Sequence, residues 1–273
     1  MDYSVLKARC GDIRRDIVAM LAEAGSGHPG GSLSSVEIVE ALYGHAMNVD
    51  PARPDMPERD RFVLSKGHCA PVFYSTLGNH GFFPKEEFTR LRKTGAMLQG
   101  HPVRDKIPGV DASSGSLGQG VSIATGMALG FKKLGTPQHV YVLLGDGECD
   151  EGLVWESFMA AAHYKLDNLT IIIDWNGMQI DGRNDEVMSL GDFPGKLRAF
   201  GLDLIEVENG NDIEQVIAAL DVPAKPGKPR CILCHTTKGK GVSFMENQVS
   251  WHGKAPNKQE AETALAELEG ANG

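Results

Sequence analysis

The sequence has 273 residues, the length of one large α/β domain or at most two small ones, and 41% of its residues are hydrophobic. Its formal net charge of −9, without a basic stripe, argues against a surface that binds nucleic acid. No apolar run approaches the length of a membrane span, no signal peptide is evident and five cysteines suit a reducing compartment, so we expect a cytoplasmic protein that does not bind a membrane.

Helices separated by glycine-rich loops are predicted for the first fifty residues. Apolar residues at helical spacing predict a helix over residues 4–24, which ends at a Gly-Ser-Gly segment. The loop that follows, residues 27–33, is too rich in glycine to be structural filler. Ser34 and Glu37 have the spacing of a capping box, so we expect the next helix to begin there and to run through about Met47.

A short buried strand and a long irregular loop are predicted for the next segment. Apolar side chains at 61–65 predict the strand, and helical patterns follow at 71–79 and 85–93. Residues 95–116 have no regular pattern, and a loop of that length in a compact domain usually serves a function. Small residues dominate the helix predicted at 120–134, so this helix can pack close to a sheet or to a second copy of itself.

Two apolar runs with polar tips form the centre of the sequence. Strands are predicted at 140–144 and 171–173, the first followed by Gly-Asp-Gly and the second by Asp-Trp-Asn. The 28 residues between Gly147 and Asn176 are enough for a crossover helix, so both tips lie at the carboxyl edge of a parallel sheet, where such sheets bind ligands. Asp146 and Asn176 can then offer oxygens to one hard cation, and the glycines let backbone approach a phosphate.

Two more strands complete the expected sheet. They are predicted at 205–207 and 231–234, with a helix at 212–220 between them and a terminal helix at 258–270. A Cys-x-x-Cys pair lies inside the second of these strands, which is more typical of buried thiols than of zinc or redox chemistry. We therefore expect residues 1–273 to form a single α/β domain, with a doubly wound, mainly parallel sheet and helices on both faces.

Four histidines lie in glycine-bearing loops, some of them at the tips of predicted strands: His28, His68, His101 and His252. A single histidine is more often an ordinary hydrogen-bonded residue than a catalytic one, but four in such loops indicate a shared site. Zinc ligation is the alternative, and the absence of a helical histidine pair or a His-x-His motif argues against it.

Seven motifs give the chain a specific resemblance to a known family. Their order and spacing resemble the diphosphate-binding (PP) domain of transketolase over essentially the whole chain, and this implies the thiamine-diphosphate-binding fold. The motifs are Gly27-His28-Pro29-Gly30, Ser65-Lys66-Gly67-His68, Gly100-His101-Pro102, Gly115-Ser116-Leu117-Gly118-Gln119-Gly120, Gly145-Asp146-Gly147, Glu151-Gly152-x-x-Trp155-Glu156 and Lys238-Gly239-x-Gly241.

The resemblance implies thiamine diphosphate and a divalent cation, Mg²⁺ or alternatively Ca²⁺ or Mn²⁺, as cofactors. The metal would be held by the side chains of Asp146 and Asn176 and by the backbone carbonyl of Met178. The residues implied to bind the cofactor are Lys66, His68, Gly115, Ser116, Leu117, Asp146, Gly147, Glu148, Asn176, Lys238 and His252.

The resemblance also implies catalytic residues. His28 and His101 would face substrate hydroxyls and exchange protons with them, as an imidazole can near neutral pH. Glu151 matches a family position that links two active sites through shared acidic hydrogen bonds, although a carboxylate at a helix start is also common for structural reasons. Some relatives carry the histidine of the diphosphate where this chain has Val249, but the Trp-His-Gly version also occurs in the family, so we expect His252 to contact the diphosphate and count it among the catalytic residues.

Complete transketolases continue through a pyrimidine-binding domain and a C-terminal domain. We therefore expect the chain to be the N-terminal subunit of a split transketolase, whose partner subunit carries those domains. Such an enzyme transfers a two-carbon ketol unit from a ketose to an aldose, usually as sugar phosphates. The helix at 120–134 and the segment 152–166 are expected to mediate self-association, giving an α2β2 heterotetramer.

Alternative functions remain open from the sequence. The chain could belong to a transketolase for an unusual ketose, or to another thiamine-diphosphate enzyme such as a split dehydrogenase or a synthase that uses a dihydroxyacetone unit. A non-enzymatic diphosphate- or nucleotide-binding module is the other class, but it would not explain the Gly-His-Pro loops.

Overall fold

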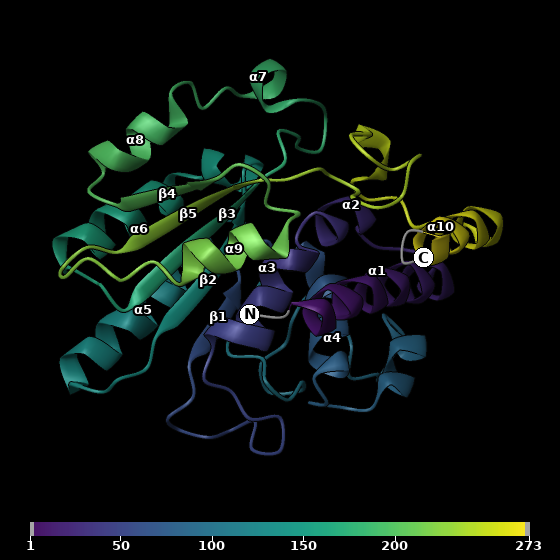
Figure 1. Ribbon diagram of the computed structural model, residues 1–273, viewed down its shortest axis with the longest axis horizontal. Helices are drawn as coiled ribbons and strands as arrows, with labels where there is room; N and C mark the ends of the chain where they lie inside the picture. Colours follow the sequence, from purple (N-terminus) through teal and green to yellow (C-terminus); the bar gives the residue numbers. More distant parts are fainter. Residues whose placement is uncertain (1–2, 271–273) are drawn as a thin grey trace.

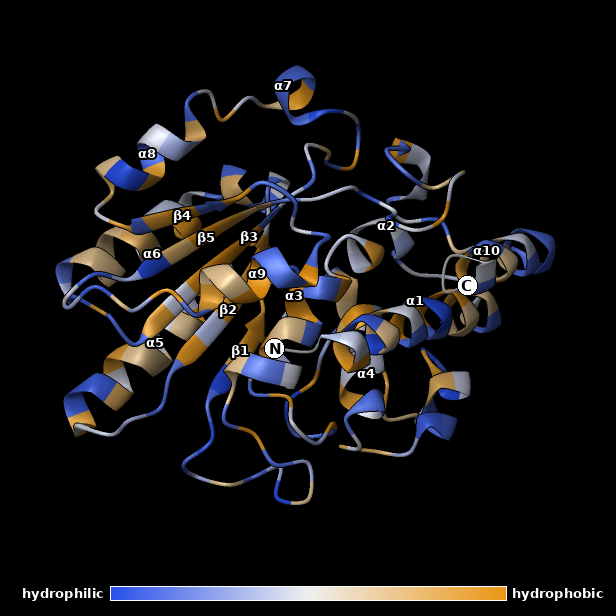
Figure 2. Cartoon of the chain, viewed as in Figure 1, coloured by the Kyte–Doolittle hydropathy of each residue, from blue (hydrophilic) through white to orange (hydrophobic). Residues whose placement is uncertain are grey.

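A five-stranded, fully parallel sheet in the order β1-β2-β3-β5-β4 lies at the centre of the computed structural model, which describes residues 3–270 (Figure 1). The central strands are rich in β-branched residues and leucine, and Figure 2 shows them among the most hydrophobic parts of the fold. Continuous apolar strands of this kind are typical of a sheet that is covered on both faces. The strands are β1 (Arg61–Leu64), β2 (Val140–Gly145), β3 (Leu169–Trp175), β4 (Asp203–Val207) and β5 (Arg230–His235).

Two hydrophobic cores lie on opposite faces of the sheet, because successive strand residues point to opposite sides. Leu143 and Ile172 join one core, whereas Val142 and Ile171 join the other. The first core contains residues of α1 (Ser4–Ala24), α3 (Val36–Ala41), α4 (Ala70–Asn79), α9 (Ile213–Leu220) and α10 (Lys258–Gly270). The second contains residues of α5 (Gln119–Leu134), α6 (Gly152–His163) and α8 (Phe193–Ala199). The predicted fold class is confirmed.

The topology brings four loops to one edge of the sheet. All paired strands are parallel, so their carboxyl ends lie together. The segments that leave β1, β2, β3 and β5 at this edge are 65–68, 145–148, 176–180 and 236–241. These segments carry the polar strand tips that the sequence singled out, and this is the edge at which open α/β sheets bind ligands.

Some local predictions were wrong. Ser34 does not form a capping box, because its hydroxyl donates to the Gly31 carbonyl and to the Asp174 carboxylate. Glu37 instead pairs with Arg14. The predicted helix begins at Val36 and not at Ser34, but it does continue nearly to Met47 as predicted, because α3 runs directly into a π-helical segment, Leu42–Ala46.

Other departures are smaller. The glycine-rich loop contains the short helix α2 (Pro29–Leu33), whose first residue is a proline, as is common at that position. The helix predicted at 85–93 is a 3₁₀ helix, Lys85–Arg90. The irregular loop at 95–116 contains no helix or strand, as predicted. Two further helices, α7 (Asn184–Val187) and α8, were not predicted.

The cysteines have the state that the sequence predicts, and the helices can be compared with what a membrane span requires. All five cysteines are free and buried, including Cys231 and Cys234 in β5, so the buried-thiol interpretation of this pair is confirmed. Within residues 3–270, no helix has both the length and the apolar character needed to cross a membrane.

Candidate active site at the carboxyl edge of the sheet

A cavity of about 320 Å³ opens where β1, β2, β3 and β5 end. Its walls combine backbone of glycine-rich turns with histidine, lysine and carboxylate side chains. Twelve of the fifteen predicted site residues line it: His28, Lys66, His68, Gly115, Leu117, Asp146, Gly147, Glu148, Asn176, Met178, Lys238 and His252.

Three oxygen-bearing groups converge on one side of this cavity. The buried carboxylate of Asp146 accepts hydrogen bonds from the backbone N–H of Gly147 at 2.8 Å and of Gly177 at 2.5 Å. Asn176 Oδ1 accepts from the Met178 N–H at 3.2 Å, and the Met178 carbonyl accepts from Lys238 Nζ at 3.1 Å. An ammonium group therefore already lies against the carbonyl that was predicted to bind a metal.

These groups suit a hard divalent cation. One carboxylate, one carboxamide and one carbonyl are the oxygen ligands that Mg²⁺ and Ca²⁺ prefer. Burial, together with the negative charge of Asp174, raises the pKa of Asp146 to about 6, so a cation would relieve an unfavourable buried charge. Among residues 3–270, no group of three or more histidine, cysteine or acidic side chains has an arrangement that could hold a metal ion.

Three histidines form a triangle across the cavity. The ring centroids of His28 and His68 are 5.1 Å apart, those of His28 and His252 are 5.6 Å apart, and His68 stacks on His252 at 5.3 Å. Burial, assisted by neighbouring positive groups, lowers the pKa of His28 and of His68 to about 4 and that of His252 to about 3. All three imidazoles are therefore neutral at pH 7 and can each donate one hydrogen bond and accept another.

Two polar atoms in this region add to its binding capacity. His28 Nδ1 is buried and has no hydrogen-bond partner. Lys238 is buried, and its ammonium group lies 2.9 Å from His252 Nδ1, in surroundings where burial lowers its pKa. A cavity that contains both an unpaired buried nitrogen and a desolvated ammonium group favours an anionic, hydrogen-bonding ligand.

Glycines allow the segments that form the cavity walls to approach one another closely. A Cβ atom at Gly147 would lie 2.8 Å from Cβ of Gln179, and one at Gly31 would lie 2.6 Å from Sγ of Cys69. Any side chain at these positions would force neighbouring elements apart, so the tight cradle requires glycine.

Two predicted cofactor-binding residues have their charged atoms turned into the protein. Lys66 Nζ donates to the Gly31 carbonyl at 2.9 Å, to Ser35 Oγ at 2.5 Å and to Asp174 Oδ2 at 2.5 Å, which uses all three of its N–H groups. The Glu148 carboxylate accepts three hydrogen bonds from the protein. Lys66 and Glu148 therefore hold the cavity walls together through these hydrogen bonds, while their direct contact with a cofactor stays a prediction.

Three predicted residues lie at the rim and not in the cavity lining. Ser116 is exposed between Gly115 and Leu117. His101 is also exposed, and its ring carbons lie 3.4 Å from a Cβ built on Gly115. Glu151 is exposed at the start of α6 and makes no capping hydrogen bond there.

Sequence reasoning missed several residues of the site. Gln179, Ile180 and Asp181 line the cavity in the loop after β3, where no local pattern distinguished them. Asp174 is fully buried beneath the cavity and did carry a signal. It is a carboxylate at the end of an isoleucine run, two residues before Asn176, and residues two apart on a strand point to the same face.

Comparison with known proteins identifies close relatives. The profile of the family described as "Transketolase, thiamine diphosphate binding domain" matches residues 7–271. An apulose-4-phosphate transketolase subunit from Actinobacillus succinogenes is 41% identical over 269 residues, which cover 98% of this chain and 97% of that protein. A 6-deoxy-6-sulfo-D-fructose transketolase subunit from Clostridium sp. is 42% identical over 257 residues, which cover 94% of each chain.

Solved structures agree with these relatives. A transketolase variant from Pichia stipitis superimposes with a TM-score of 0.92 at 31% identity, covering 99% of this chain and 41% of that one. Transketolase from Campylobacter jejuni also gives a TM-score of 0.92, at 30% identity, with 98% and 43% covered. This chain thus spans about two fifths of those transketolases but nearly all of the two relatives that are themselves single subunits. The chain therefore belongs to the transketolase family, whose thiamine diphosphate binding domain it matches over nearly its whole length.

Proposed function

We propose that the cavity binds the diphosphate half of thiamine diphosphate together with a divalent cation, most simply Mg²⁺. When bound, this cofactor supplies the carbon nucleophile that cleaves a carbon–carbon bond of a ketose and retains a two-carbon unit. The observation that carries the proposal is the convergence of Asp146, Asn176 and the Met178 carbonyl beside the histidine triangle.

The residues of the cavity divide into metal and anion contacts. Asp146 and Asn176, with the Met178 carbonyl, hold the cation, which neutralises the diphosphate. Lys238 lies against that carbonyl and supplies a positive charge to the anion. His68 and His252, which are neutral, each donate a hydrogen bond to it.

The rim of the cavity contacts the rest of the cofactor and the sugar. The backbone of Gly115 and Leu117 lines the cavity and is placed to meet the aminopyrimidine, with Ser116 between them. His28, whose Nδ1 lacks a partner, and His101 hydrogen-bond substrate hydroxyls and carry protons to and from them.

The proposed reaction is transfer of a two-carbon ketol unit from a ketose to an aldose. The relatives that this chain covers almost completely are named as subunits, one for apulose-4-phosphate and one for 6-deoxy-6-sulfo-D-fructose. This supports a donor outside the common pentose phosphates and a sugar substrate that carries an anionic group. It also supports action with a partner subunit that provides the pyrimidine-binding domain.

The proposed assembly is an α2β2 heterotetramer located in the cytoplasm. Exposed large apolar side chains on the outer face of α5 and α6 support self-association: Ile123, Leu134 and Met159 are 38%, 75% and 54% exposed. Obligate interfaces are larger and more apolar than transient ones. Glu151 lies at the start of α6 and would reach a second active site through this contact.

Calorimetric titration tests the cofactor assignment. Thiamine diphosphate is titrated into the chain mixed with its partner subunit, with and without Mg²⁺, and tight binding is expected only with the metal. A transferase of this kind should also release an aldose when given a ketose donor. Metal-independent binding would contradict the assigned ligands.

A further inference from the structure

We propose that Asp174 is a positioning residue that fixes the carboxamide of Asn176 with its oxygen toward the cation. The inference rests on the proposed metal site and assigns a function to a residue that does not touch it. Asp174 is fully buried at the end of β3, two residues before Asn176. Its Oδ2 accepts a hydrogen bond from Asn176 Nδ2 at 3.0 Å.

The chemistry of this contact allows one orientation of the carboxamide. A carboxylate can only accept hydrogen bonds, so it selects the NH₂ end of the neighbouring Asn176 side chain and would repel the oxygen end. The oxygen of Asn176 is thereby directed to the opposite side, where it accepts from the Met178 N–H. Partners that orient metal ligands in this way typically contribute a factor of about 10–100 to metal affinity.

The carboxylate is itself held firmly. Oδ2 of Asp174 also accepts from Lys66 Nζ at 2.5 Å and Ser34 Oγ at 2.6 Å, and Oδ1 accepts from the Thr236 hydroxyl. These donors come from three segments that are far apart in the sequence. Asp174 therefore has little freedom to rotate away from Asn176.

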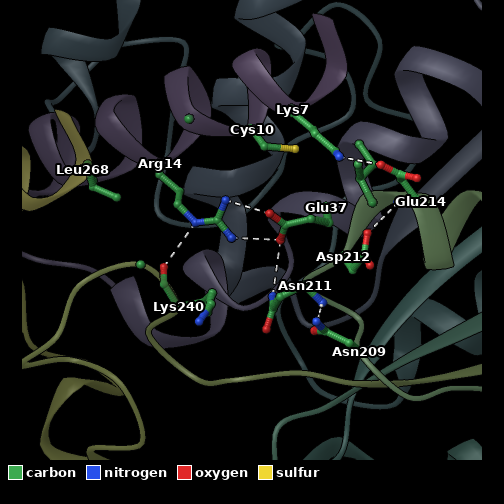
Figure 3. A pocket seen from close by; sticks show the side chains of 13 residues that line it. Lys7, Cys10, Arg14, Glu37, Asn209, Asn211, Asp212, Glu214, Lys240 and Leu268 are labelled. Carbon is green, nitrogen blue, oxygen red and sulfur yellow. Dashed lines mark hydrogen bonds and ion pairs between the residues drawn. The ribbon is translucent and has the colours of Figure 1, made fainter. Parts of the chain in front are cut away.

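A second cluster joins two of these segments, those that carry Ser34 and Thr236. Asn211 Nδ2 donates to the Ser34 carbonyl, and its Oδ1 accepts from the Thr237 N–H. Arg14 pairs with Glu37, which also accepts from Asn211, and Arg14 Nε donates to the Lys240 carbonyl (Figure 3). The cluster borders a separate cavity of about 550 Å³, and it joins α1 and α3 to the loop that carries Lys238.

Two variants separate the effect of Asp174 on the orientation of Asn176 from its effect on the stability of the fold. In Asp174→Asn, the Lys66 ammonium can only donate, so it keeps the new carboxamide oxygen at the Oδ2 position and Asn176 retains its acceptor. Replacing the pair as Lys66→Met with Asp174→Leu removes both charges together, so no buried charge is left unpaired, but it also removes the acceptor of Asn176 Nδ2 and of the Thr236 hydroxyl. Both variants should lose stability, but only the second should lose metal affinity.

The measurement is a Mn²⁺ titration monitored by electron paramagnetic resonance. It uses the chain together with its partner subunit and thiamine diphosphate, at a temperature where circular dichroism shows that each variant is folded. We expect Asp174→Asn to bind Mn²⁺ within threefold of wild type despite a lower Tm. We expect the Met–Leu double variant to bind about 10–100-fold more weakly, although its Tm is also lowered as in Asp174→Asn.

A matched control uses another buried ion pair, Arg59 with Asp111, next to the amino end of β1. Arg59→Met with Asp111→Leu should leave Mn²⁺ affinity unchanged. The inference is overturned if the double variant at Lys66 and Asp174 binds Mn²⁺ like wild type, or if affinity follows Tm in all variants. If Asp174→Asn does not fold, the double variant alone decides. A wild-type complex that binds no Mn²⁺ overturns the proposed function itself, and the inference with it.

Discussion

Substitution of Glu148 should lower stability markedly, because its one buried carboxylate joins three segments of the cavity wall. Its Oε1 accepts from Ser65 Oγ at 2.5 Å and from the Gly118 N–H at 2.8 Å, and its Oε2 accepts from the Gly145 N–H at 3.0 Å. Glu148 is 3% exposed, so water cannot replace these partners. Glu148→Gln keeps the shape of the side chain and exchanges one acceptor for a donor.

The hydrogen bonds of Glu148 set the size of the expected loss of stability in Glu148→Gln. Whichever end of the carboxamide faces Gly118, one backbone N–H, of Gly118 or of Gly145, then faces an NH₂ group and loses its acceptor. An unsatisfied buried donor costs about 1–3 kcal/mol, and two charge-assisted hydrogen bonds become neutral ones, at about 1 kcal/mol each. Relief of the buried charge offsets part of this cost. We expect the free energy of unfolding to fall by about 2–4 kcal/mol.

Urea unfolding followed by circular dichroism measures this change, with Glu156→Gln as the control. Glu156 is exposed on α6, so its substitution should alter stability by less than about 0.5 kcal/mol. Because the Gly118 loop also carries Gly115 and Leu117, Glu148→Gln should weaken thiamine diphosphate binding as well. An equally small effect of both substitutions would refute the wall-holding role of Glu148.

Three other perturbations test the division of roles within the site. Asp146→Ala should abolish metal-dependent binding of thiamine diphosphate in calorimetry while the circular dichroism spectrum stays unchanged, because it removes the only charged metal ligand. His101→Ala should preserve cofactor affinity and lower kcat or raise the KM for the ketose donor, because His101 lies outside the cavity lining. His68→Gln should flatten the decrease in unfolding free energy between pH 6.5 and pH 4. The pKa of His68 is lowered from 6.5 to about 4 by burial, so the unfolded chain binds this proton first as the pH falls, and stability present above pH 6.5 is lost toward pH 4.

Specific outcomes would contradict these expectations. Equal loss of cofactor by the variants at Asp146 and His101 would show that anchor and substrate residues are not separate. An unchanged pH slope in the His68 variant would show that this imidazole is not held neutral in the folded protein.

Much of the fold could be predicted because parallel strands buried on both faces are continuous apolar runs. The polar residues at the ends of those runs indicated the edge of the sheet at which the site lies. Asp146 and Asn176 both line the cavity there, as expected. The directions of charged side chains could not be predicted. Lys66 and Glu148 turn inward because their partners, such as Asp174 and Gly118, come from distant segments.

The same reason explains the failed capping box. Ser34 had a suitable local spacing, but its hydroxyl finds the Asp174 carboxylate, 140 residues away, at 2.6 Å. A charged acceptor in a buried site forms a stronger hydrogen bond than the backbone of a helix end. Local spacing contains no information about such an acceptor.

Reconstitution of ketol transfer tests the central claim most directly. The purified chain and a separately purified protein carrying the pyrimidine-binding and C-terminal domains are assayed alone and mixed, with thiamine diphosphate, Mg²⁺, a ketose donor and an aldose acceptor. We predict no transfer by this chain alone, because the proposed split enzyme has the pyrimidine-binding half of its cofactor site on the partner subunit, and robust two-carbon transfer by the mixture. Full turnover by the chain alone, or a mixture that binds the cofactor but transfers no two-carbon unit, would contradict the claim.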